Sequence, residues 1–528
     1  MIGSYVTPSG QTDGGVDVTQ SYTPEGHSEI AIHDPILPFG SIHTEKLTPI
    51  FQSDGVYGIN SGQELTVTTL SGTATVTDGM FTVTTGTTSL AQGVILGRKR
   101  LRYRAGQGVV GRLTARFPTL ASYSYLIAGF GHSEDGIYFA CKEIAGGTPK
   151  IGFLKVDHGV RETRTLTVTV GATSSGNVTI TLNDVAFAIA VTNASNIQRT
   201  VYEISQGSYA GWDAYPAGAT VVFLRKAAGV TAGAYSFSAG TTGSAASMAQ
   251  TKAGAATTET FVPQDEWNGD RMDGSAGDYN KSGVKIDYTK LNIFDFHIGY
   301  LGTDNTVIKC KVEPPSSNNS TWITVHTFAH TNSRVTPIFG NPSFPFTMAA
   351  YSAGSTTDIS VQCGSFAGFI EGTKVLHGNR FSYYGQSTAV DSSAYRALFT
   401  IMNARYYGGR SNQAVINLLS SSGALKHTSP CIFYLIRGGT LTGNPNFQTV
   451  ASNSCSLWDT ASTVVSGGEI VWTAHLGDTG EFDHHFGNGE FNAEEITLQP
   501  GEWMTLAAKS VTGTPSYVTG SINTREDQ

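Results

Sequence analysis

The chain has 528 residues, enough for about three or four domains, and its composition is poor in charge and rich in glycine, with 14% charged residues and 62 glycines. This composition is unlike that of a cytosolic enzyme rich in Glu, Lys and Leu. A formal net charge of −8 argues against a dedicated nucleic-acid-binding protein, which usually carries a basic field.

The first 95 residues divide into two segments of different texture. Residues 1–45 are polar and punctuated by glycine and proline, which predicts an extended N-terminal arm without a core of its own. Residues 46–95 alternate Thr and Val with few charges, which predicts a small β segment. Flat strands of this kind are prone to aggregate when their edges are free, so the alternative is that they pair with a neighbouring subunit.

Residues 96–160 alternate with a period of two, which is typical of half-buried antiparallel strands. Basic residues alternate with apolar ones over 98–104, and Val110, Arg112, Thr114 and Arg116 continue the pattern. The basic cluster favours a strand that faces solvent or another subunit over a nucleic-acid patch. The strand, the glycine-rich turn and the aromatic strand over 129–139 together resemble the first half of a concanavalin-type lectin sandwich.

Residues 161–256 read as an inserted α+β module. Strands with turns at 175–177 and 183–184 precede a helical spacing of Ile197, Val201 and Ile204, for which Asn193 or Ser195 is the predicted N-cap. A strand follows, and then a stretch over 228–258 that is rich in Gly, Ala and Ser. The unit resembles small modules that recur in tail and capsid proteins of tailed phages.

The rest of the chain again predicts strands. Residues 257–373 contain several strand candidates that complete the lectin-like β-sandwich begun at 96–160, and residues 374–528 form a C-terminal, jelly-roll-like β-sandwich. Residues 394–403 are ambiguous, because Leu398, Ile401 and Met402 also fit a helical period. The predicted fold class is therefore mainly β, with two sandwiches and one inserted α+β module.

The cysteines carry no disulfide or zinc pattern. They are scattered, odd in number and free of any C-x-x-C spacing, at Cys141, Cys310, Cys363, Cys431 and Cys455. We expect free buried thiols and assembly in a reducing cytoplasm. The first residues lack the features of a signal peptide, and no apolar run reaches the ~18 residues needed to span a membrane, so we expect no membrane insertion.

Aromatic residues in turn-rich segments are the candidate glycan-binding residues, because flat rings stack on sugar faces. The candidates are Tyr123, Tyr125, Trp212, Tyr215, Tyr406 and Tyr407. For each of them, packing in a core or at a protein interface is the alternative.

One loop resembles a calcium-binding loop in its opening residues. Asp278, Asn280, Ser282 and Asp287 are the candidate ligands, but Thr289 stands where a bidentate Glu is expected. An ordinary Asx/Gly turn is the alternative, and calcium is the one cofactor that the sequence suggests. A second, weaker metal candidate is the face that Glu481, Asp483 and His485 would share on an alternating strand.

No catalytic constellation is visible. Glycosidases need two carboxylates about 5–9.5 Å apart, and adjacent residues on a strand point to opposite faces. The acidic pairs are therefore interpreted as turn carboxylates: Glu134-Asp135, Asp265-Glu266 and Glu494-Glu495. Neither a nucleophile motif nor a phosphate-binding loop occurs, and we expect no enzymatic activity.

Several segments together are similar to a group of virion structural proteins from tailed phages, particularly marine ones, and some large DNA viruses. They are 101–108, 129–139, 298–302, 341–356, 498–510 and 521–528, and the resemblance covers most of 35–528. It implies a structural protein of a phage virion, assembled in the host cytoplasm, without fixing its place in the particle. Within that class we favour a non-enzymatic tail fibre, appendage or spike that binds host-surface glycan. A capsid decoration or head-fibre protein and a polysaccharide-degrading tailspike enzyme are the alternatives.

Polar β-domains without cysteine bridges gain stability by burying strands between subunits, and extended arms gain it by wrapping neighbouring chains. We expect a homotrimer that contacts other virion proteins through its N-terminal arm. No nucleic acid is expected among its partners.

Overall fold

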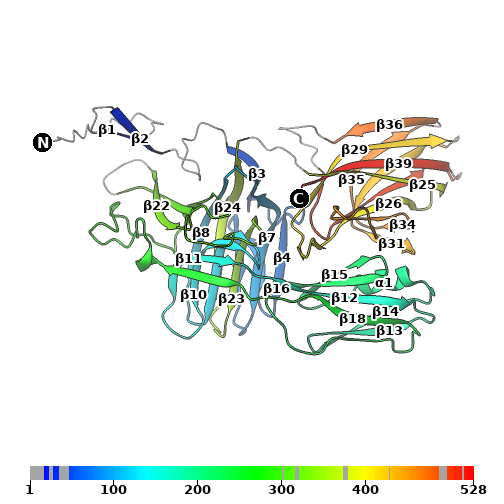
Figure 1. Cartoon of the computed structure of the whole chain (residues 1–528), viewed down its shortest axis with the longest axis horizontal. Helices are drawn as coiled ribbons and strands as arrows, with labels where there is room; N and C mark the ends of the chain where they lie inside the picture. The colour runs from blue at the N-terminus through cyan, green and yellow to red at the C-terminus, as the bar shows by residue number, and fades with distance from the viewer. Residues whose placement is uncertain are drawn as a thin grey trace. The chain divides into compact units, whose positions relative to one another are not determined.

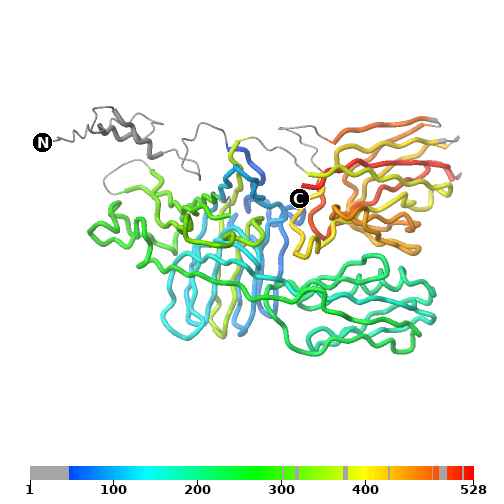
Figure 2. The backbone as a smooth tube through the Cα atoms, viewed as in Figure 1, coloured from blue at the N-terminus to red at the C-terminus, as the bar shows by residue number. Residues whose placement is uncertain are grey.

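The computed structural model describes residues 17–22, 28–34, 47–299, 302–314, 320–372, 378–426, 429–477, 479–486, 496–513 and 516–527. The chain divides into two compact units, which Figure 1 labels by element and Figure 2 traces by residue number. Unit 1 comprises Met1–His158 and Thr258–Lys374, and unit 2 comprises Gly159–Thr257 and Val375–Gln528. Antiparallel strands dominate both units, which confirms the predicted mainly-β fold class.

The core of unit 1 lies between two large antiparallel sheets. Sheet 1 runs in the order β19 (Thr258–Pro263), β11 (Lys150–Asp157), β10 (Gly136–Glu143), β9 (Ser124–Gly131), β23 (Ser343–Ser352), β7 (Gln92–Arg102) and β4 (Glu64–Thr69). Sheet 2 runs in the order β22 (Thr321–Phe328), β21 (Thr306–Val312), β20 (Asn292–Ile298), β8 (Val109–Thr119), β24 (Ser360–Glu371), β6 (Met80–Thr84) and β5 (Thr73–Thr77). A further strand, β3 (Leu47–Asp54), also pairs with β24.

An aromatic core joins the inner faces of these two sheets. Phe139 of sheet 1 stacks on Phe117 of sheet 2, with 4.6 Å between the ring centroids, and lies 4.5 Å from Phe294. Phe153 stacks on Trp267 at 4.6 Å. Because alternate residues of a strand point to opposite faces, the burial of the core-facing residues sends the polar residues of β8 outward.

The N-terminal strands pair within the same chain. Residues 46–95, expected to form a separate small β segment or to pair with a neighbouring subunit, instead supply β3, β4, β5, β6 and the start of β7 to the two sheets. Of the predicted arm over 1–45, the structure describes β1 (Asp17–Tyr22) and β2 (Ser28–Asp34), which pair with each other. The remaining residues of that segment lie outside the described ones.

The inserted module, at the start of unit 2, has two small sheets and a helix. Its first sheet, sheet 3, runs β15 (Trp212–Ala217), β16 (Thr220–Ala228), β12 (Arg161–Val170), β18 (Ala245–Lys252). Its second sheet, sheet 4, runs β14 (Val185–Val191), β13 (Gly176–Leu182), β17 (Ser236–Ser238).

The helix, α1 (Ile197–Ser205), is where the sequence predicted one, but its cap differs. Asn196 is the N-cap, and its side chain accepts a hydrogen bond from the Arg199 N–H at 2.9 Å. Ser195 instead adopts a left-handed conformation with φ 48° and donates its N–H to the Ala172 carbonyl. The predicted caps Asn193 and Ser195 were wrong because the chain turns once more before the helix starts.

The C-terminal part of unit 2 is the second sandwich. Sheet 5 runs β25 (Arg380–Val390), β39 (Ser516–Asp527), β29 (Val415–Lys426), β36 (Thr479–His485). Sheet 6 runs β31 (Thr440–Gly443), β34 (Ser462–Ser466), β26 (Tyr395–Asn403), β38 (Trp503–Ser510), β30 (Cys431–Arg437), β35 (Glu469–Leu476).

The ambiguous segment 394–403 is a strand, β26, so the helical alternative was wrong. Phe399 and Ile401 pack in the core between the two sheets, whereas Met402 packs in a separate cluster with side chains of the inserted module. Burial on both faces makes most positions of this strand apolar. The resulting run imitates the spacing of a buried helix, as fully buried strands generally do.

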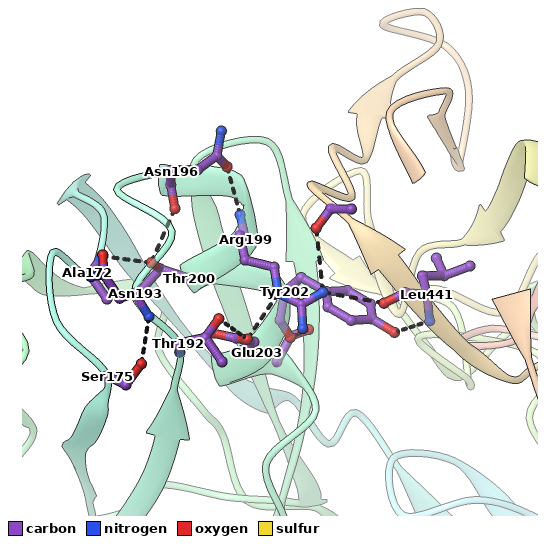
Figure 3. A network of polar contacts seen from close by, with 12 residues as sticks. Ala172, Ser175, Thr192, Asn193, Asn196, Arg199, Thr200, Tyr202, Glu203 and Leu441 are labelled. Carbon is purple, nitrogen blue, oxygen red and sulfur yellow. Dashed lines mark hydrogen bonds and ion pairs between the residues drawn. The ribbon is translucent and has the colours of Figure 1, made fainter. Parts of the chain in front are cut away.

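The module docks onto sheet 6 through α1 (Figure 3). The Tyr202 hydroxyl oxygen accepts a hydrogen bond from the Leu441 N–H at 2.9 Å, and Arg199 donates to the Leu441 carbonyl at 3.3 Å. A main-chain bond from the Gly218 N–H to the Phe447 carbonyl, 2.6 Å long, adds a second attachment. The module and the second sandwich therefore share one buried boundary inside unit 2.

The thiols behave as predicted. All five cysteines are free and buried. Burial raises the pKa of Cys141, Cys310 and Cys363 to about 12, so these groups are protonated at neutral pH.

Candidate functional site on the outer face of sheet 2

The predicted glycan-binding aromatics are divided between the units. In unit 1, Tyr123 lies in the β8–β9 connection and is 44% exposed, while Tyr125 lies on β9 with the Lys142 ammonium 5.9 Å from its ring centroid. In unit 2, Trp212 and Tyr215 are each only 5% exposed and belong to hydrophobic clusters.

The last two aromatics, Tyr406 and Tyr407, are half-buried on the short strand β27 (Tyr406–Tyr407). Tyr406 packs against the same hydrophobic cluster as Tyr215, whose hydroxyl donates to the Tyr406 carbonyl at 3.4 Å, so these two rings serve the core of unit 2.

The calcium-like loop is organised by hydrogen bonds between its own groups. Asn280 donates to the Ser275 carbonyl, the Ser282 hydroxyl donates to Asn280 Oδ1, and the Asp287 carboxylate accepts from the Thr289 N–H. Asp278, the remaining candidate ligand, is exposed in the same loop.

A residue outside the predicted set organises this loop. Asp270 accepts the Met272 N–H with one carboxylate oxygen and the Ser282 N–H with the other, at 3.0 and 2.8 Å. No group of three or more His, Cys, Asp or Glu side chains in the described part of the chain is arranged to hold a metal ion. Glu481, Asp483 and His485 do share the exposed face of β36, where His485 lies 3.7 Å from Asp483.

The first acidic pair ties loops together. Glu134 and Asp135 are both buried in the β9–β10 turn, and the Asp135 carboxylate accepts the N–H groups of His158, Gly340 and Asn341. Burial raises the pKa of Asp135 although these hydrogen bonds oppose the shift. This carboxylate therefore links the β9–β10 turn to the backbone at His158 and at Gly340 and Asn341.

The other two acidic pairs lie elsewhere in the chain. Asp265 and Glu266 lie in the short 3-10 helix η1 (Gln264–Glu266). The pair Glu494-Glu495 lies outside the described residues.

A different constellation lies on the outer face of sheet 2. Arg112 of β8 and Asp295 of β20 are directly opposite each other in the strand register. Their side chains form a bidentate pair, with Nε 2.6 Å from Oδ1 and Nη2 2.7 Å from Oδ2. This parallel geometry gives the strongest form of a carboxylate–guanidinium contact, and it fixes the plane of the guanidinium.

Two aromatic rings flank the guanidinium. The Arg112 Cζ atom lies 5.0 Å from the centroid of Trp322 on β22 and 5.8 Å from that of Phe369 on β24. The Lys311 ammonium lies 5.8 Å from the same Trp322 ring. Trp322 is half-buried and Lys311 is exposed, so the indole and the ammonium both reach solvent. Cations within about 6 Å of an aromatic face are attracted by its quadrupole, which holds the indole in place.

The electrostatics of the pair follow from the burial of its acid. The side chain of Asp295 is 4% exposed and that of Arg112 is 41% exposed. Burial by itself would raise the pKa of Asp295, but hydrogen bonds and charge from Arg112, with His297 at 3.6 Å, hold that pKa below its ordinary value. The pKa of Arg112 is raised by its bond to Asp295. The Asp295 carboxylate is therefore charged at neutral pH, and both of its oxygens already accept hydrogen bonds from Arg112.

Further basic residues line the same face. In the strand register Lys309 pairs with Asp295, Lys311 pairs with Trp322, and Arg116 continues the outward row of β8. Arg116 is held by a 2.6 Å hydrogen bond to the Gln362 side chain. The face therefore combines a half-buried ring, a guanidinium fixed by its bidentate pair and the ammonium groups of Lys309 and Lys311.

Sequence reasoning predicted strands of this face but named none of its residues as a binding site. The outward row of β8 was visible as alternation over 110–116, and Lys309 and Lys311 show the same period. Trp322 and Asp295 were missed, because the strand order that brings them to Arg112 is not encoded locally.

Comparisons with known proteins add little. No family model matches this chain, and neither does any curated protein. Among solved structures, one match is the Faustovirus major capsid protein, at 7% identity over 90% of each chain with a TM-score of 0.08, which carries no argument about fold or function. No helix in the described ranges is long and apolar enough to cross a membrane.

Proposed function

We propose that this chain is a non-enzymatic structural component of a virus particle, of the tail-fibre, appendage or spike type, and that it binds glycan on the host surface. The observation that carries the binding role is the outer face of sheet 2, where Trp322 stands beside the fixed guanidinium of Arg112. A planar ring next to a rigid hydrogen-bond donor suits a sugar, which offers an apolar face and hydroxyl groups around its rim.

The structural role is supported by the kind of fold. Both units are antiparallel sandwiches stabilised by aromatic and aliphatic cores, with polar Thr, Ser and Gly on the outside. The resemblance of several segments to virion proteins points to a particle as the place of this fold. We further propose that the chain forms a homotrimer and contacts other virion proteins through its N-terminal arm. Light scattering of the purified chain measures its molar mass and so tests the homotrimer directly.

Binding is tested on the full chain with an array of host-surface glycans. We expect binding to a subset of glycans, and the Trp322→Ala variant should lose at least about tenfold in affinity, because a stacked aromatic contact is removed from the centre of the site. Tyr57→Ala is the matched control, since Tyr57 is fully exposed on a different part of unit 1. Release of oligosaccharides during the assay would instead indicate an enzyme.

The position in the particle is tested by immunogold electron microscopy of intact virions. Gold on the tail or on fibres supports the attachment role. Gold spread evenly over the head would replace it with a capsid-decoration role, and the absence of gold would contradict the virion assignment.

A further inference from the structure

The charges on the outer face of sheet 2 define the class of glycan that it binds. Five neighbouring strands carry this face, β22, β21, β20, β8 and β24. Their sequences hold four Lys or Arg residues, namely Arg112, Arg116, Lys309 and Lys311, against two carboxylates, Asp295 and Glu371. These strands therefore carry a formal balance of +2, on a chain whose formal net charge is −8.

All four cations lie on the outward side. Ile308 and Cys310 are buried in the core between the sheets, so Lys309 and Lys311 alternate with them and point away from it. The same alternation on β8 places Arg112 and Arg116 outward, because Leu113 and Ala115 are core residues.

The two carboxylates do not neutralise the four cations. Asp295 is buried beneath the site with both oxygens on Arg112, and Glu371 is buried and accepts the Gly108 N–H. Lys311 is exposed beside the Trp322 ring. In the strand register Lys311 lies opposite Trp322, whereas Lys309 lies opposite Asp295. The Lys311 ammonium lies beside the Trp322 ring, and Lys309, two residues earlier on the same strand, lies about 7 Å further along the same outward row.

We propose that this face binds an acidic polysaccharide, one whose sugars carry carboxylate or sulfate groups, with a pyranose ring on Trp322 and the acid groups on Lys311 and Lys309. The inference rests on the proposed glycan-binding function and specifies the ligand class of that same site. A single-stranded nucleic acid also carries rings and anionic groups, so single-stranded DNA is included among the probes of the test.

The test measures binding of the full chain to four probes by biolayer interferometry at low and high salt. The probes are polygalacturonate for carboxylate, heparin for sulfate, dextran as a neutral polysaccharide and a single-stranded DNA. We expect binding to at least one acidic polysaccharide, weakened by salt because the charges are exposed, and no binding to dextran. The Lys309→Gln/Lys311→Gln variant should bind about tenfold more weakly, since bonds to charged groups are the strong ones.

Lys150→Gln is the matched control, because Lys150 is an exposed lysine on sheet 1 of the same unit and should leave binding unchanged. Equal binding of dextran would overturn the acidic class and leave glycan binding intact. Binding of none of the polysaccharides would overturn both proposals. Tight DNA binding that depends on the same two lysines would overturn the glycan assignment in favour of a general polyanion face.

Discussion

The outer face of sheet 2 depends on a carboxylate that is buried under the groups that pair with it. A buried acid is costly to desolvate, and the bidentate bond from Arg112 offsets that cost for Asp295 only as long as the guanidinium stays in place. The aromatic rings of Trp322 and Phe369 hold it there from two sides. Stability of the sheet and geometry of the site are therefore linked at one residue.

Replacement of this arginine should destabilise unit 1. Arg112→Met leaves the Asp295 carboxylate buried without its partner, and breaking a buried pair costs about 3–5 kcal/mol. Because the Arg112 side chain is 41% exposed and water can partly replace it, we expect a loss of about 2 kcal/mol in the free energy of unfolding. Urea denaturation measures it. The double variant Arg112→Met/Asp295→Leu should recover most of the loss, and an unchanged single variant would contradict the role of the pair.

Two buried histidines predict an acid-dependent loss of stability. Burial lowers the pKa of His326 and of His330 from 6.5 to about 4. Between these values the unfolded chain binds protons that the folded chain does not, so stability falls as the pH drops from about 6.5 to 4. The Tm should decrease over this window.

The histidine contribution can be separated from that of the carboxylates. Asp157 and Asp295 have lowered pKa values, so their stabilising contribution is lost only below about pH 4, while Asp135, with a raised pKa, acts in the opposite direction. His326→Phe removes the titratable imidazole, so the slope of Tm against pH should become smaller. The phenyl ring keeps an aromatic side chain stacked on Phe153, as the imidazole is in the native protein. An unchanged slope would show that His326 is not the group responsible.

At the scale of elements, close packing between strands decides which positions need glycine. A Cβ atom on Gly111 of β8 would lie 2.4 Å from the ring of Phe130 on β9, a core residue that also contacts Phe296 and Phe346. The glycine makes room for a large ring between the two sheets. It explains why a strand of alternating residues is interrupted by a residue with low strand propensity.

Gly111→Ala should therefore destabilise the first sandwich. The added methyl group overpacks the core, which costs about 1–3 kcal/mol, so the midpoint of urea unfolding should fall. Gly364→Ala is the matched control, because its Cβ would meet no atom closer than 3.8 Å and also lies in sheet 2. Equal effects of both substitutions would attribute the loss to strand backbone rather than to the Phe130 ring.

At the scale of the whole molecule, the two compact units are each assembled from segments that are distant in sequence. The inserted module interrupts unit 1 in the chain but packs against the second sandwich within unit 2. The polar part of that boundary is the network around Tyr202 and Arg199 in Figure 3. Folding of unit 2 therefore requires a contact between residues about half the chain apart.

Tyr202→Phe should weaken this boundary. The variant removes the acceptor for the buried Leu441 N–H, and an unsatisfied buried donor costs about 1–3 kcal/mol. Hydrogen–deuterium exchange should then increase at the Leu441 amide and over α1. Tyr209→Phe provides the comparison, because the Tyr209 hydroxyl bonds the Ile204 carbonyl inside the module. Unchanged protection at Leu441 would contradict the docking role.

The sequence by itself determined the features that depend on local periodicity and composition. Alternating residues predicted strands such as β8, β20 and β21. The pair Asn183 and Asp184 predicted a turn, in which both residues have positive φ angles. Scattered cysteines without a C-x-x-C spacing predicted the free thiols. These properties arise within a few residues of one another.

Only the tertiary structure decided which strands meet and which face of each strand is buried. Arg112 and Asp295 are 183 residues apart in the chain, and their contact exists because β8 and β20 are neighbours in sheet 2. The same pairing assigned residues 46–95 to the first sandwich and the module to the second. Strand order follows from the burial of apolar faces summed over the whole chain, a quantity that no single segment carries.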